Sequence, residues 1–132
     1  MTTPLGYVTS LRNTRLDAIT TAVGASGLID IYDGTKPTTG GAATTLLAQL
    51  TCSTTFAPAA SSGVLTANTI TADASANATG TATWGRLKTS GGTTVADFTV
   101  GTSGASLILT TTSIVATQPV SISSFVITEG NT

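Results

Sequence analysis

The sequence predicts a mainly β fold, an antiparallel β-sandwich of jelly-roll-like type with one N-terminal α-helix. Three observations lead to this expectation. From residue 28 onward, short segments rich in Thr, Val and Ile are separated by Gly, Pro, Ser and Asn, a pattern typical of strands joined by turns. Several of these segments alternate apolar and polar residues, as strands with one buried face do. Helical periodicity is clear only near the N-terminus.

The helix is expected to begin at Thr9 or Ser10, either of which can cap it, and to end at about residue 24, where Gly24 permits a left-handed turn. Its expected apolar arc contains Val8, Leu11, Leu16, Ala18, Ile19, Ala22 and Val23. This arc should face other apolar groups. Arg12 and Arg15 project into the same arc, so each needs a carboxylate partner or access to water.

The remainder of the chain is expected to form seven strands that build two packed sheets. Their predicted ranges are 28–32, 46–53, 64–72, 78–88, 94–100, 107–112 and 120–128. Turns begin at Asp33-Gly34 and Ser90-Gly91-Gly92, where the residue types favour a change of direction. The single helix should lie across one end or flank of the sandwich.

The length of 132 residues corresponds to one domain, with the helix at about 9–24 and the sandwich at about 28–129. The N-terminal segment has neither a basic start nor an apolar run, and nowhere do eighteen apolar residues follow one another. We therefore expect a soluble chain that is made in the bacterial cytoplasm and does not contact a membrane.

The composition argues against catalysis. The chain has no histidine, a single cysteine (Cys52), five Lys and Arg residues and six Asp and Glu residues. General acid and base catalysis, nucleophilic catalysis and metal-assisted mechanisms depend on those scarce groups. Cys52 also has no partner for a disulfide or a zinc site within the chain. We therefore predict a protein that is not an enzyme and has no catalytic residue, cofactor or metal.

The low charge also restricts the partners. A formal net charge of −1 provides no basic field for nucleic acid, so direct nucleic-acid binding is not expected. Only 8% of the residues are charged, and the mean hydropathy is positive at +0.35. Monomeric proteins carry more surface charge than this, which indicates that much of the exterior touches other proteins. Few charges are available to protect strand edges, so burial in an assembly is the expected protection.

Two features could in principle form a site. Asp30 and Asp33 are the densest carboxylate cluster, although their spacing does not match a calcium-binding EF-hand loop. The alternative is that Asp30 pairs with an arginine of the helix and that Asp33-Gly34 begins a turn. Trp84 could stack on a sugar, but its small neighbours favour a core anchor near a strand end.

Five segments resemble small virion proteins encoded by tailed bacteriophages and prophages. They are residues 11–19 (LRNTRLDAI), 28–37 (LIDIYDGTKP), 46–50 (LLAQL), 78–86 (ATGTATWGR) and 120–128 (VSISSFVIT). Within such particles, a sandwich of this size is similar to the capsid decoration, or cement, proteins. No catalytic residues come with this resemblance.

The resemblance implies a position on the capsid exterior, the major capsid protein as partner, and self-association as a trimer or dimer. Arg12 and Arg15 are the candidate interface residues, with a salt bridge to Asp30 inside the chain as the alternative. A tail, neck or fibre subunit is the competing role. In a receptor- or glycan-binding module of that kind, Trp84, Tyr7 or Tyr32 would stack on sugar.

Overall fold

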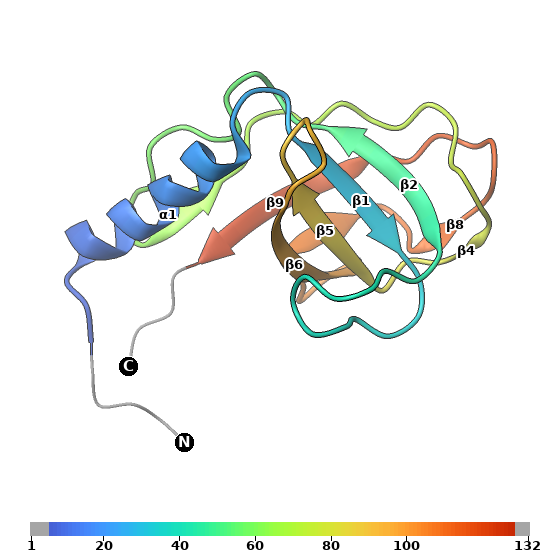
Figure 1. Cartoon of the computed structure of the whole chain (residues 1–132), viewed down its shortest axis with the longest axis horizontal. Coiled ribbons are helices and arrows are strands. Elements are labelled where there is room, and N and C mark those ends of the chain that lie inside the picture. The colour runs from blue at the N-terminus through green and yellow to red at the C-terminus, as the bar shows by residue number, and fades with distance from the viewer. Residues whose placement is uncertain (1–5, 129–132) are drawn as a thin grey trace.

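In the computed structural model, which describes residues 6–128, one helix and nine strands are present (Figure 1). Their bounds are α1 Thr9–Val23, β1 Leu28–Tyr32, β2 Leu46–Thr51, β3 Val64–Thr66, β4 Gly80–Thr81, β5 Trp84–Lys88, β6 Thr94–Gly101, β7 Leu107–Leu109, β8 Ser113–Ile114 and β9 Ile122–Thr128. The mainly β class and the single N-terminal helix are therefore confirmed for this part of the chain. Glu129, at the end of the predicted sandwich, lies outside the described residues.

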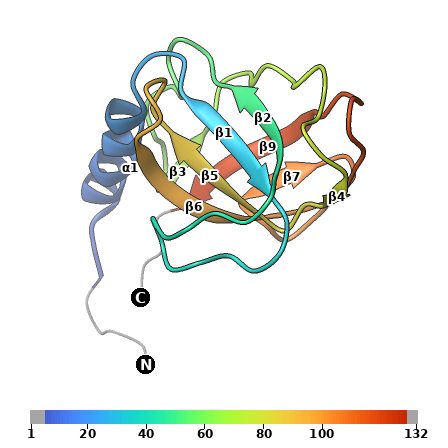
Figure 2. The ribbon, with the colours of Figure 1, turned by 45° about the vertical axis from the view of Figure 1, so that its right-hand side comes forward.

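Seven strands form one curled mixed sheet in the order β2-β1-β5-β6-β7-β9-β3, and β4 pairs with β8 in a small separate sheet (Figure 2). Most neighbours are antiparallel, but β6 and β7 run parallel. A purely antiparallel arrangement is therefore wrong at this pair. The arrangement differs from the expected two packed sheets, because seven of the nine strands belong to one curled sheet.

The two ends of the curled sheet are linked by the chain that follows β3. After Thr66, Ala67 N–H donates to the Phe125 carbonyl (3.0 Å), and further on Thr71 forms a bridge with Thr51 beside β2. The predicted strand 64–72 is therefore split, because its first part pairs at one end of the sheet and its last part at the other.

The predicted strand 78–88 is split for a similar reason. Ala82 N–H donates to the Thr112 carbonyl (2.8 Å), whereas Thr83 N–H donates to the Tyr32 carbonyl (3.0 Å). The backbone therefore changes partners between β4 and β5. The sequence analysis missed β8, which is only two residues long and pairs with β4.

The free edge of β2 is covered by the chain itself. Asn77 N–H donates to the Leu47 carbonyl (2.7 Å), and the Asp73 carboxylate accepts a hydrogen bond from Gln49 N–H (2.9 Å). A covered edge cannot recruit a foreign strand. The expectation that assembly protects the strand edges is thus wrong for this edge.

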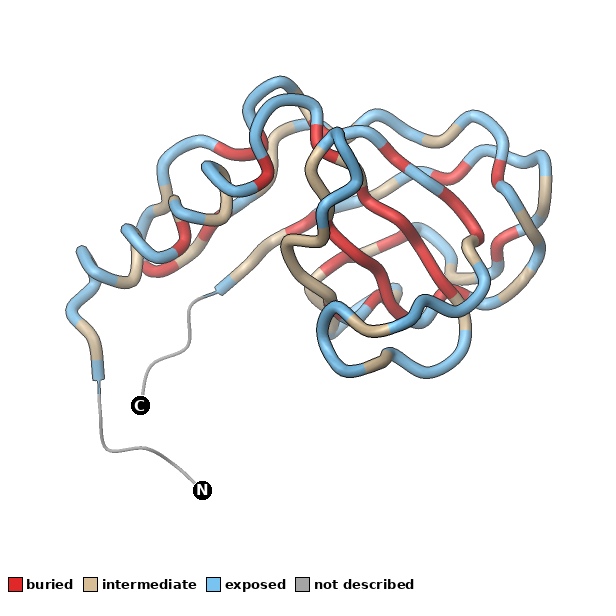
Figure 3. Tube along the Cα trace, in the orientation of Figure 1, coloured by how far each residue is buried: buried red, intermediate tan, exposed pale blue. Residues whose placement is uncertain are grey.

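One hydrophobic core fills the inside of the curl. Figure 3 shows the buried segments gathered along the strands that surround it. The rings of Phe98 in β6 and Phe125 in β9 lie 4.7 Å apart, and Phe56 contacts Phe125 edge-on at 5.8 Å. These contacts join strands from different parts of the sheet across one core.

Helix α1 lies at one side of the sheet and contacts β3 and β6 (Figure 1). Its N-cap is Val8, whose backbone is extended, and no side chain caps it, so the expected cap at Thr9 or Ser10 is wrong. The end of the helix at Gly24 is confirmed, and its positive φ of 70° is one that glycine readily adopts, but its ψ of −157° differs from that of the expected left-handed turn. Within the described residues, α1 is too short and too polar to cross a membrane.

The expected apolar arc of α1 is only partly buried. Leu16 and Val23 are buried and Ile19 is half-buried, whereas Val8 and Leu11 are 69% and 43% exposed. The helix therefore turns only a narrow apolar stripe toward the core.

We predict that Gly85→Ala lowers the free energy of unfolding by about 1–3 kcal/mol, because a core side chain would have to move. A Cβ at Gly85 would lie 2.7 Å from Phe98 Cε2 and 3.0 Å from the Asp30 carbonyl oxygen. Gly91→Ala is the matched control, since the nearest neighbour of its added Cβ would be Thr89 Oγ1 at 3.8 Å. Urea unfolding of both variants measures the difference, and equal stabilities would contradict the packing.

Candidate functional site

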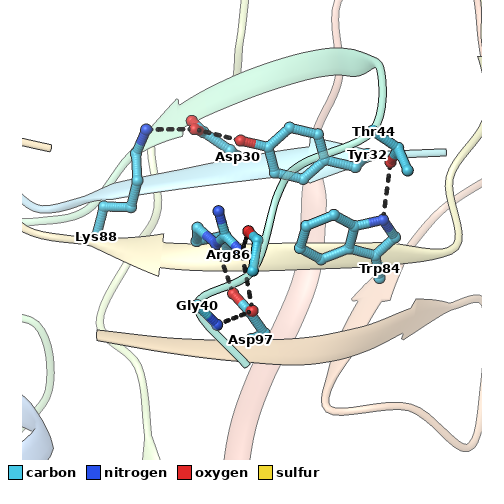
Figure 4. A network of polar contacts seen from close by, with 9 residues as sticks. Asp30, Tyr32, Gly40, Thr44, Trp84, Arg86, Lys88 and Asp97 are labelled. Carbon is cyan, nitrogen blue, oxygen red and sulfur yellow. Dashed lines mark hydrogen bonds and ion pairs between the residues drawn. The ribbon is translucent and has the colours of Figure 1, made fainter. Parts of the chain in front are cut away.

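The outer face of strands β1, β5 and β6 carries a cluster of charged and aromatic side chains (Figure 4). Alternation along each strand places Asp30 and Tyr32 of β1, and Trp84, Arg86 and Lys88 of β5, on this face, while Ile29, Ile31 and Leu87 face the core. Asp97 of β6 pairs in register with Arg86. The loop of residues 33–45, here called the strap, crosses over part of the cluster.

Asp30 is the centre of one half of the cluster. Its carboxylate lies 2.6 Å from Lys88 Nζ and accepts hydrogen bonds from Tyr32 Oη (3.0 Å) and Gln49 Nε2 (2.8 Å). Burial, together with the Asp30 charge, raises the pKa of Tyr32 to about 12. The cation beside Asp30 is Lys88, so the expected pairing of Asp30 with a helix arginine is wrong. Lys88 reaches it from the neighbouring strand, which a one-dimensional pattern does not reveal.

Arg86 and Asp97 form the second half. Arg86 Nε donates to Asp97 Oδ1 (2.7 Å) and Arg86 Nη2 donates to Oδ2 (3.0 Å), a two-point ion pair. The same pair holds the strap, because Arg86 Nη2 donates to the Gly41 carbonyl (2.8 Å) and Gly40 N–H donates to Asp97 (2.9 Å). The hydrogen bond from Arg86 is the main reason that the pKa of Asp97 is lowered, and the same bond raises the pKa of Arg86.

Trp84 anchors the base of the strap, where its first and last residues come together. Its ring is fully buried and stacks on Tyr32, with centroids 4.4 Å apart. Trp84 Nε1 donates to the Asp33 carbonyl and to Thr44 Oγ1, both at 3.0 Å. The interpretation of Trp84 as a buried anchor near a strand end is confirmed, although its ring lies beneath the strap on the outer face of the sheet and is not part of the hydrophobic core. A sugar platform made by Trp84 or Tyr32 is wrong, because Tyr32 is only 6% exposed.

The two carboxylates that were considered for calcium have separate structural roles. Asp30 binds Lys88, while the Asp33 carboxylate accepts a hydrogen bond from Thr45 N–H (3.1 Å) and closes the base of the strap. Within residues 6–128, no group of three or more potential ligands is arranged to hold a metal ion.

Each described aspartate accepts an internal hydrogen bond. Asp73 binds Gln49 N–H and Ser75 N–H, and Asp17 binds Ala60 N–H (2.8 Å). With Asp30, Asp33 and Asp97, this accounts for every acidic residue of the described part. Among the charged residues described, only Arg15 and Lys36 are exposed. The charges therefore hold the fold together, and the outer surface is almost uncharged.

Arg12 and Arg15 lie three residues apart on α1 and have different surroundings. Arg12 is half-buried against the backbone of Gly63, where an added Cβ would lie 2.0 Å from its Nη2 atom. Arg15 is exposed, and its guanidinium lies 4.7 Å from the centre of the Tyr7 ring. Arg12 therefore packs on the loop after Ala60, and Arg15 belongs to the outer surface.

Two polar residues that the sequence analysis did not single out attach the helix to the loop at residues 60–63. Asn13 Oδ1 accepts a hydrogen bond from Gly63 N–H (2.9 Å), and Asp17 accepts from Ala60 N–H. Their position one turn apart on the helix was a usable signal. The sequence alone does not show which loop supplies the N–H groups that bind to these two side chains.

The surface has two hollows large enough for a small ligand. One, of about 270 Å³, is lined by residues 110–111, 113–115 and 118–121, and the other, of about 280 Å³, lies between residues 67–70 and 122–125. Neither is lined by a charged residue, and the one aromatic residue, Phe125, is buried.

No family model, curated protein or solved structure matches this chain.

We predict that the Arg86–Asp97 pair makes the stability depend on pH. The pKa of Asp97 is lower in the folded state than its ordinary value of 3.8, so the stabilisation is present above that value and is lost as pH falls through the lowered pKa. Asp97→Asn should therefore destabilise the protein near neutral pH and flatten the loss of stability on acidification. Unfolding followed at about pH 7 and at about pH 3 measures this change.

The double variant Arg86→Gln/Asp97→Asn is the control for this pair. Removing one member of a buried pair costs about 3–5 kcal/mol, because the other charge is left without its partner. The double variant should therefore lose less stability than the two single variants combined. Strictly additive losses, or an unchanged pH dependence in Asp97→Asn, would contradict the assigned role.

Proposed function

We propose that this chain is a non-enzymatic structural protein of a tailed-bacteriophage or prophage particle, of the capsid decoration (cement) type. The observation that carries the proposal is the disposition of charge. Every described carboxylate is engaged inside the fold, and only Arg15 and Lys36 are exposed among the charged residues described. On the surface of a soluble domain that works alone, about 25–35% of the residues are charged. The surface of this chain has fewer charges, which suits it to extensive contact with other proteins.

The particle itself is inferred from the sequence motifs. The segment LIDIYDGTKP forms β1 and the first part of the strap, and ATGTATWGR includes β4 and the buried Trp84 and Arg86. Two of the motifs that resemble virion proteins thus supply the first part of the strap and two of its anchors, Trp84 and Arg86. A sandwich-like arrangement similar to that of decoration proteins, with the curled sheet closed over its core, is part of the same proposal.

A cement protein acts by binding and needs no turnover. Each copy that bridges neighbouring major capsid subunits adds its binding free energy to the shell, and many copies act together. Lattice symmetry favours a dimer or trimer on a symmetry axis. We therefore propose the capsid exterior as the location, with the major capsid protein and further copies of this chain as partners and with no nucleic-acid or membrane contact.

The fold and the charge are also compatible with a tail, neck or fibre subunit. The number of copies per particle distinguishes such a subunit from a decoration protein. A glycan-binding role has less support, because Trp84 and Tyr32 are buried and the Tyr7 ring is half-buried beneath Arg15. The polar cluster likewise gives no basis for a reaction, since its carboxylates, its lysine and its arginine bind one another or the strap.

The test is to measure how many copies of this chain are present in purified particles of the phage that encodes it. Quantitative mass spectrometry should find a fixed ratio to the major capsid protein, comparable to the number of capsid subunits. Particles made without the gene should release their genome at lower temperature than complete particles. A few copies per particle would assign the chain to the tail or neck, and unchanged heat resistance would exclude a cement function.

A further inference from the structure

The tip of the strap, which consists of Gly40 and Gly41, is attached to the sheet by two hydrogen bonds. Gly40 N–H donates to Asp97 Oδ2 (2.9 Å), and Arg86 Nη2 donates to the Gly41 carbonyl (2.8 Å), as Figure 4 shows around Arg86 and Asp97. Among the described residues outside the strap, the tip has no other hydrogen-bond partner. The attachment of the tip therefore depends on two charged side chains alone.

The base of the strap, Asp33, Thr44 and Thr45, is attached more firmly. Trp84 Nε1 donates to the Asp33 carbonyl and to Thr44 Oγ1, both at 3.0 Å, and Thr45 N–H donates to Asp33 Oδ1 (3.1 Å). The Trp84 ring beneath these residues is 0% exposed. Release of the base would expose this ring to water and break the hydrogen bonds of its N–H, and both changes cost free energy.

The segments between the base and the tip do not hold the strap down. They are residues 35–39 and 42–43, and all of them are exposed except the half-buried Pro37. Within the described part of the chain, neither segment has a hydrogen bond to the sheet. A hydrogen bond from Gly41 N–H to the Thr38 carbonyl (2.7 Å) lies inside the strap. The tip can therefore move on these two segments while the base keeps its contacts.

The ion pair beneath the tip stays complete when the tip lifts. Arg86 Nε and Nη2 bind the two carboxylate oxygens of Asp97 at 2.7 and 3.0 Å, and neither bond includes the strap. Lifting the tip thus leaves no charge without its partner, and an unpaired buried charge is the largest cost of breaking such a site. Gly40 is already exposed, so water can replace the two lost backbone partners.

We propose that the strap is a latch whose tip opens while its base and the sheet stay closed. The closed state covers the Arg86–Asp97 pair. The open state presents a guanidinium N–H and a carboxylate oxygen side by side, in place of their bonds to the strap backbone. An opening that breaks so few contacts should need much less free energy than global unfolding. The inference goes beyond the proposed function and does not depend on it.

The backbone of Gly40 provides a way to shift the latch. Its φ of 82° is one that glycine adopts freely and that strains other residues. A Cβ at this position would meet no atom within 4 Å, so Gly40→Ala adds backbone strain to the closed tip without a clash, and the strain is relieved when the tip opens. Gly92, in the turn between β5 and β6, has a φ of 95° and the same open surroundings. Gly92→Ala is therefore the matched control, with its strain outside the strap.

Amide hydrogen exchange at residue 40, followed by NMR, tests the opening of the tip. Gly40→Ala should lower the protection of this amide by about tenfold, whereas Gly92→Ala should leave it unchanged. In the wild-type chain this protection should depend only weakly on urea, because the opening exposes little surface. Equal losses of protection in the two variants would show that residue 40 exchanges through global unfolding and would overturn the latch, as would an unprotected amide in the wild-type chain.

A second variant tests whether the base stays closed. Gly40→Pro removes the N–H that binds Asp97 and cannot adopt a positive φ, so its tip is always open. Trp84 is the only tryptophan of the chain and reports on the base. Acrylamide should quench its fluorescence equally weakly in Gly40→Pro and in the wild-type chain, and strongly in both after unfolding in urea. Strong quenching in folded Gly40→Pro, or failure of this variant to fold, would contradict a tip that opens alone.

Discussion

The fold depends on carboxylates that bind the chain's own backbone and cations. Asp30 and Arg86 are the buried charged residues of the described part, and each lies in a network that satisfies it. A buried charge without a partner would be strongly destabilising, so the outer face of β1, β5 and β6 is held to one arrangement. The strap is fixed by the same charges, through Gly40 and Gly41. An outlying loop and the central strands are thus joined by one ion pair.

This internal use of charge connects the fold with the proposed role. Ser, Thr, Ala and Gly make up most of the exposed positions, because only 8% of the residues are charged and the described aspartates accept hydrogen bonds within the chain. A surface of this kind is poorly suited to a chain that works alone in solution, and well suited to one that is covered on a particle. The covered edge of β2 is consistent with that role, since this edge is closed to the addition of a foreign strand.

The sequence predicted those features of the fold that local patterns determine. Helix α1 ends at Gly24 as expected, β1 has the predicted range of 28–32, and Trp84 anchors a strand end. Sequence patterns gave the wrong strand bounds where one continuous segment pairs with two different neighbouring strands. Residues 64–72 and 78–88 look like single strands because their Thr-rich alternation is continuous, yet each is divided between two neighbours. The parallel pair of β6 and β7 depends on a long-range choice that alternation does not encode.

The candidate site was predictable to a similar extent. The low charge and the importance of Asp30 were visible, but the partner of Asp30 was assigned to the helix, because cross-strand register was unknown.

The central claim, that the aspartates are engaged internally, is tested most directly by carboxyl-directed chemical labelling of the native protein with peptide-level mass analysis. The account predicts that Asp30 and Asp97 stay almost unlabelled in the native state and react readily once the chain is unfolded. Rapid labelling of both in the native protein would contradict it.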